Sequence, residues 1–172
     1  MGPAEPGDPT PTTWAAWEQH LVDAVLALPD GGSVTVAAPP GHARLARPST
    51  RSRLRWLVGG RRRPISPAAR LVRVEDHLRG HWPGADRLGG PFPWSREEVE
   101  AIQALGWHAP TVTDGEDFVR FWPDDVAQGP YLPEADARRA AAALAESFRM
   151  VLDLSPEGGP PHVGWPALQI SS

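Results

Sequence analysis

Apolar residues recur at helical spacing in the segment that begins at Ser95, so one stripe of a helix is predicted to face a core. Ser95 stands three residues before Glu98, a spacing that predicts a capping box joining each side chain to the other's backbone amide. Gly106 follows the last apolar position and is predicted to end the helix, because glycine readily adopts a left-handed backbone. The apolar positions of the stripe are Val99, Ile102 and Leu105.

A second apolar pattern follows a further capping pair, Thr113 and Glu116. The spacing of Phe118, Phe121 and Trp122 predicts a short helix with an aromatic face, which Pro123 ends. A loop rich in Gly and Pro then leads to a long amphipathic helix. Its apolar positions recur in steps of four and three: Ala137, Ala141, Leu144, Phe148 and Val151.

The first half of the chain predicts one helix followed by short strands. Thr13 is a suitable cap for a helix over residues 14–28, and alternating residues predict strands at 33–38 and 69–75. Weaker alternation at 43–47 and 53–58 predicts further strands, whereas the Gly- and Pro-rich residues 80–93 predict a loop. The predicted elements begin and end with helices and have strands between them. This order favours an α+β fold with two layers, a small antiparallel sheet and the helices that flank it.

The chain is long enough for one domain, which we expect at residues 13–154. Residues 1–12 are rich in proline and predict a disordered lead-in, and residues 155–172 predict an extended tail that contains Trp165. The lead-in has neither a basic start nor an apolar core and is therefore unlike a signal peptide. We also find no apolar run of membrane-spanning length, so we expect a cytoplasmic protein.

The order "SREEVEAIQALGWHAP", then "EDFVRFWP", then a final amphipathic helix resembles the actinobacterial TY-Chap family. Proteins of that family are similar to YbjN and to the type III secretion chaperones. The resemblance covers residues 13–154 and is most specific around Leu105-Gly106-Trp107. It implies a secretion-chaperone-like fold and a peptide-binding role. Residues 44–73 depart from the family pattern, because they form a longer and more basic stretch.

Composition excludes several kinds of chemistry. The chain has no cysteine, and all 17 basic residues are arginine. Disulfides, thiol nucleophiles, Schiff bases and lysine-bearing phosphate loops are therefore excluded. The net charge of −4 is unevenly distributed, because ten of the arginines and no acidic residue lie between Asp30 and Glu75. This basic stretch either attracts an acidic partner or neutralises the acidic helices within the fold.

Two groups of side chains are candidates for catalysis or metal binding. His77 and His81 would face the same way on a helix, but no third ligand stands at a useful spacing. A run of carboxylates near aromatic residues fits no calcium loop, and capping explains those at the start of a helix. The members of this run are Asp114, Glu116, Asp117, Asp124 and Asp125. We therefore predict no catalytic residue, no metal site and no cofactor.

We predict a non-catalytic module that binds a protein or peptide, with an acidic partner and a homodimer as open alternatives. Tryptophans at the ends of elements can keep one face exposed, although packing in the core is the alternative role for each of them. Arginines can attract an acidic partner. An anion- or nucleic-acid-binding module built on the arginine-rich strands is the alternative function, although no reader motif is present. The candidate partner-binding residues are Trp107, Phe118, Trp122, Trp56, Arg61, Arg62 and Arg63.

Overall fold

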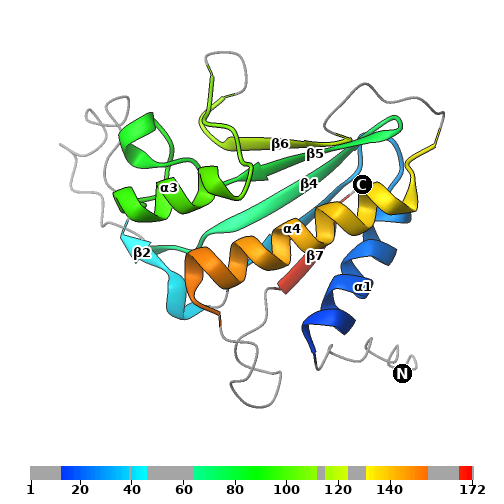
Figure 1. The fold of residues 1–172 in the computed structure, drawn as a ribbon, viewed down its shortest axis with the longest axis horizontal. Helices are drawn as coiled ribbons and strands as arrows, with labels where there is room; N and C mark the ends of the chain where they lie inside the picture. Colours follow the sequence, from blue (N-terminus) through cyan, green and yellow to red (C-terminus); the bar gives the residue numbers. More distant parts are fainter. Residues whose placement is uncertain are drawn as a thin grey trace, which may run out of the picture.

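The structure is a computed structural model that describes residues 13–38, 40–45, 64–111, 115–123, 131–154 and 167–171. Figure 1 shows the order of the elements along the chain. The helices are α1 (Trp14–Leu26), α3 (Arg96–Ala104) and α4 (Glu134–Leu152), with short 3-10 turns at Pro40–His42 and Asp86–Leu88. The strands are β1 (Ser33–Ala37), β2 (Arg44–Leu45), β3 (Pro64–Ile65), β4 (Ala68–Val74), β5 (His77–Trp82), β6 (Phe118–Trp122) and β7 (Ala167–Ser171).

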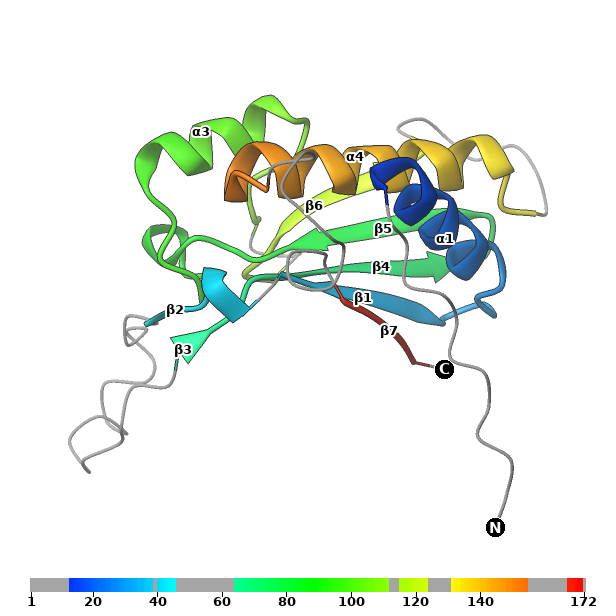
Figure 2. The ribbon, with the colours of Figure 1, turned by 90° about the horizontal axis from the view of Figure 1, so that it is seen from below.

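The fold has two layers, as Figure 2 shows: helices α1, α3 and α4 lie on one side of the main sheet. The strand order of that sheet is β6-β5-β4-β1-β7, and every neighbouring pair is antiparallel. Strands β2 and β3 form a separate two-stranded ribbon. The predicted α+β class with a small antiparallel sheet is confirmed.

Two of the three predicted helix caps are present, and the third, Thr113 with Glu116, precedes a segment that is a strand and not a helix. The Thr13 hydroxyl accepts a hydrogen bond from the backbone N–H of Ala16 at 3.1 Å, which satisfies one free amide at the start of α1. Both hydrogen bonds of the predicted capping box join Ser95 and Glu98 at the start of α3. Gly106, at φ +85°, follows the end of α3 in the left-handed conformation.

Two segments that were predicted as a helix and as part of a loop are strands in the structure. Phe118–Trp122 is strand β6 and not a helix, because it pairs with β5 along its whole length. Residues 80–82, which were predicted as part of a loop, belong to strand β5, in which Leu78, Gly80 and Trp82 alternate with half-buried polar residues. Long-range pairing between strands therefore outweighs the local signals for a helix and a loop.

The C-terminal segment also joins the sheet. Residues 167–171, which the sequence placed in an extended tail, pair with β1 as strand β7. Residues 155–166 and Trp165 among them lie outside the described residues.

The core between the helices and the sheet is rich in tryptophan. Trp82 from β5 lies 5.0 Å from Phe148 of α4 and 5.8 Å from Trp107, measured between ring centroids. Gly80, two residues earlier on β5, leaves the space that the rings of Trp107 and Trp122 fill. Within the described residues, no helix is both long and apolar enough to cross a membrane.

Candidate functional site

The face of the sheet turned away from the helices is the most distinctive surface of the fold. No described helix covers it (Figure 2). Side chains alternate across a strand, so the residues on this face come from every second position of β1, β4, β5 and β6. The strand register aligns them in rows across the sheet. They include Thr35, Arg70, Val72, Arg79, His81 and Phe121.

This face carries positive charge and one exposed aromatic ring. Arg70 is exposed, and the guanidinium carbon of Arg79 lies 5.8 Å from the ring centroid of Phe121, a cation–π arrangement. No aspartate or glutamate occupies the outward positions of the described strands β1, β4, β5 and β6. The arrangement is chemically suited to an extended, acidic segment with apolar side chains.

The chain itself pairs with both edges of the sheet, at one residue of β6 and along the whole of β1. At the β6 edge, His108 and Val119 exchange two backbone hydrogen bonds of 2.8 and 3.0 Å. At the other edge, β7 pairs with all five residues of β1. A peptide commonly adds to a protein as an extra strand at a sheet edge. A segment that already pairs with an edge would therefore have to leave before a peptide could pair there.

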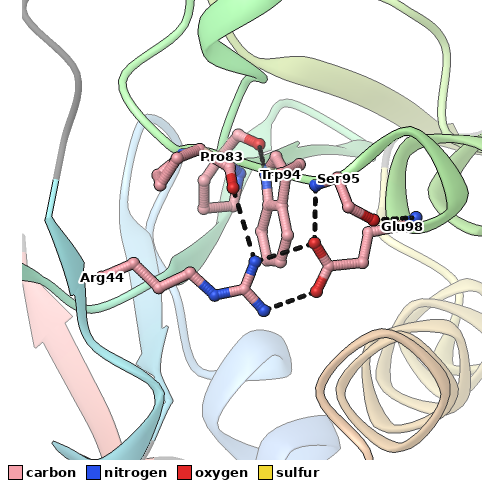
Figure 3. Close-up of polar contacts among 6 residues, drawn as sticks. Arg44, Pro83, Trp94, Ser95 and Glu98 are labelled. Carbon is pink, nitrogen blue, oxygen red and sulfur yellow. Dashed lines mark hydrogen bonds and ion pairs between the residues drawn. The ribbon is translucent and has the colours of Figure 1, made fainter.

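Arg44 connects the β2–β3 ribbon to the start of α3. Its guanidinium donates to both carboxylate oxygens of Glu98, at 2.8 and 2.5 Å, and lies 5.5 Å from the ring centroids of Phe92 and Trp94. Figure 3 shows how Glu98 faces both Arg44 and the backbone of Ser95. The hydrogen bond from Arg44 lowers the pKa of Glu98 below its usual value, although burial opposes this effect. Sequence analysis identified Glu98 only as a cap, because nothing local indicates its distant partner.

The match to known families decides how this fold is classified. A family model described as "T3SS (YopN, CesT) and YbjN peptide-binding chaperone 3", or TY-Chap3, matches residues 7–156.

The chain belongs to the TY-Chap3 family.

Membership of TY-Chap3 confirms the resemblance and implies a peptide-binding, chaperone-like role. It points to a non-catalytic protein with a protein partner. It gives no support to the anion- or nucleic-acid-binding alternative. No curated protein and no solved structure matches the chain.

The aromatic candidate residues of this TY-Chap3 protein lie in its core. Trp107, Phe118 and Trp122 are 2, 0 and 1% exposed, so the expectation of an open face on the two tryptophans is wrong. The indole N–H of Trp107 donates to the Ser147 hydroxyl at 2.9 Å, which joins it to α4. These three residues shape the sheet from within. The other candidate residues, Trp56, Arg61, Arg62 and Arg63, lie outside the described residues.

Among the described residues, the candidate metal and carboxylate groups do not converge. His77 and His81 lie on a strand and not on a helix. A strand rises about 3.3 Å per residue, so their backbone positions are about 13 Å apart, which is too far for both side chains to bind one ion. The Asp117 carboxylate accepts a hydrogen bond from the backbone N–H of Gly84 at 3.1 Å, and Glu116 is exposed. Asp114, Asp124 and Asp125 lie outside the described residues. Where residues are described, no group of three metal-binding side chains is found.

The residues of the uncovered sheet face were missed, although the sequence contains a signal for some of them. Along β5, His77, Arg79 and His81 alternate with Leu78, Gly80 and Trp82, a pattern with a period of two that is typical of a half-buried strand. The neighbouring glycines and prolines had favoured a loop over this reading.

Proposed function

We propose that this TY-Chap3 protein holds an extended segment of a partner protein on its sheet, without catalysing a reaction. The observation that carries this proposal is the family match over residues 7–156, whose description names peptide-binding chaperones. The uncovered, positively charged sheet face supports it, because such a face attracts an extended chain with acidic residues.

The chemistry of the face suggests which segment it holds. Arg70 is exposed on β4 and has a planar guanidinium whose donors suit carboxylates. Phe121, 36% exposed, and Val74, 37% exposed, offer apolar contact at the same face. A segment that alternates acidic and apolar residues would satisfy both kinds of contact. We include Trp56 and Arg61–Arg63 in the proposal, because their positions in the sequence continue the basic stretch.

Trp107, Phe118 and Trp122 contribute to this proposal indirectly. Their burial beneath β5 and β6 stabilises the sheet on which the partner segment would lie. A homodimer formed through the same face would hide it. The mass of the protein in solution should therefore be measured by light scattering alongside every binding experiment.

An array of synthetic peptides tests the proposal. Extended peptides with acidic and apolar residues should bind the chain, and peptides of the same composition in scrambled order should bind less. Arg70→Glu reverses one charge on the sheet face and should weaken binding of acidic peptides about tenfold, which corresponds to about 1.4 kcal/mol. Arg96→Glu is the matched control, because Arg96 is exposed on α3, on the other side of the sheet. Equal losses in the two variants, or no retained peptide, would contradict the proposal.

A further inference from the structure

Strand β7 occupies the edge of β1 in the position that an added peptide strand would take. The five residues Ala167–Ser171 pair antiparallel with the five residues Ser33–Ala37, from Ser33 opposite Ser171 to Ala37 opposite Ala167. The family match ends at residue 156, so β7 lies outside the part of the chain that the family shares. The matched part of the chain therefore ends before the strand that closes this edge.

The hydrogen bonds of β1 show which of its backbone groups face β7. Arg73 donates to the Gly32 carbonyl at 2.9 Å, and Ala38 donates to the Pro67 carbonyl at 2.9 Å, so the even-numbered positions bond toward β4. Bonding alternates along an antiparallel strand. The backbone groups of Ser33, Thr35 and Ala37 therefore face β7 and would form an open edge without it.

The two edges of the sheet differ in what closes them. The β6 edge is bridged by His108, which follows α3 closely and lies inside the family match. The β1 edge is closed by a segment that returns from beyond α4 and pairs with no other strand than β1. Of the two, β7 is the occupant whose release would break backbone pairing with β1 alone among the described strands.

The sequence of β7 indicates what the β1 edge accepts. Leu168 and Ile170 stand opposite Val36 and Val34, whose side chains are fully buried. Polar or small residues occupy the remaining positions of β7, which are Ala167, Gln169 and Ser171. The register therefore favours an extended segment with apolar residues two positions apart.

We propose that the β1 edge is the peptide-binding edge of this protein and that β7 is an internal occupant which a partner segment displaces. This inference rests on the proposed peptide-binding function. The ligand is an extended segment that runs antiparallel to β1, with two apolar residues opposite Val34 and Val36. Because β7 belongs to the same chain, its effective concentration at the edge is on the order of millimolar, and a partner must compete with it.

A reversible disulfide between β1 and β7 tests displacement in the full chain. Thr35→Cys with Gln169→Cys places the two thiols at directly opposite positions. Opposite residues of a hydrogen-bonded pair lie about 5.5 Å apart at Cα, within the range of about 4.4–6.8 Å that a disulfide spans. The chain has no other cysteine, so only this bond can form within it. The reduced form of the same variant is the matched control.

The probe is a fluorescein-labelled peptide with the chain's own residues 164–172, and fluorescence anisotropy measures its binding. Oxidation should weaken binding of the probe at least about tenfold, because the disulfide removes the state in which β7 has left β1 and the edge is open. Reduction of the disulfide should restore binding. A probe N-methylated at the Gln169 amide, which faces β1, should lose binding, whereas N-methylation at Leu168 should be tolerated.

Several outcomes would overturn the inference. Equal binding to the oxidised and reduced forms would mean that the peptide adds outside β7 or elsewhere. A disulfide-linked dimer would mean that β7 pairs with a second copy. Because β7 competes at an effective concentration on the order of millimolar, the titration extends to protein concentrations of that order, and failure of the reduced form to bind the probe there would mean that the β1 edge accepts no free strand.

The peptide array separates this inference from the proposed function. If the oxidised form retains the same array peptides as the reduced form, the proposed function stands and the β1 edge is not the site. If both forms retain no array peptide, the proposed function fails, whatever the probe shows at the edge.

Discussion

Arg44 and Glu98 stand 54 residues apart and meet through two hydrogen bonds between guanidinium and carboxylate. The same carboxylate accepts the backbone N–H of Ser95 at 2.7 Å. Glu98 therefore caps the start of α3 and also anchors the β2–β3 ribbon. One side chain couples a local cap to a long-range contact.

Removing the charge of Glu98 should destabilise the fold. Glu98→Gln keeps the size of the side chain but weakens both contacts, and we expect the free energy of unfolding to fall by about 1–2 kcal/mol. Glu100→Gln on the same helix is the control, because its exposed pair with Arg96 should contribute only about 0.3–0.5 kcal/mol. Urea denaturation measures both, and a loss in Glu98→Gln no larger than the control's would contradict the coupling.

The stability from Glu98 should depend on pH. Its pKa in the folded chain lies below the usual 4.5, chiefly because Arg44 donates to the carboxylate. The folded chain therefore binds this proton less tightly than the unfolded chain, and stability rises with pH through that range. The difference in unfolding free energy between wild type and Glu98→Gln should be constant from about one pH unit above the usual pKa of 4.5 and shrink as the pH falls below it. A difference that instead grows on acidification would refute the assignment.

The sequence predicted the parts of the fold that depend on neighbouring residues. The caps at Thr13 and Ser95 were predicted correctly, because a capping side chain and its amide lie within three residues. Phe118–Trp122 was not, because its apolar residues fit both the helical and the strand period, and only pairing with β5 decides between them. Strand β7 depends wholly on a distant partner, β1.

The candidate site was harder to predict than the fold, because exposure depends on what packs over a residue. Trp107 follows the end of a helix, where one face can remain open, but Ser147 of α4 lies against it. The outward positions of β5 could be recognised only once that segment was known to be a strand. A local pattern predicts which side chains share a face, but not which face the helices cover.

The two buried tryptophans should respond differently to replacement by phenylalanine. Trp107→Phe removes the hydrogen bond to Ser147, whereas the indole N–H of Trp122 has no hydrogen-bond partner among the described residues. Both changes leave a similar cavity in the core. Trp107→Phe should therefore cost about 1 kcal/mol more than Trp122→Phe in the free energy of unfolding. Thermal and urea denaturation of the two variants measure the difference, and the reverse order would show that the bond adds nothing.

Gly80 should be the least replaceable small residue of the central strands. A Cβ atom at this position would lie 2.7 Å from Cζ3 of Trp122 and 3.1 Å from Cη2 of Trp107, and both rings are held in the core. Gly80→Ala should therefore lower the free energy of unfolding by about 1–3 kcal/mol, because the rings must shift. Gly41→Ala is the control, since a Cβ there would meet no atom within 4 Å, and its effect should stay within about 0.5 kcal/mol. Equal stability of the two variants in urea would mean that the rings can move aside and that β5 does not depend on glycine.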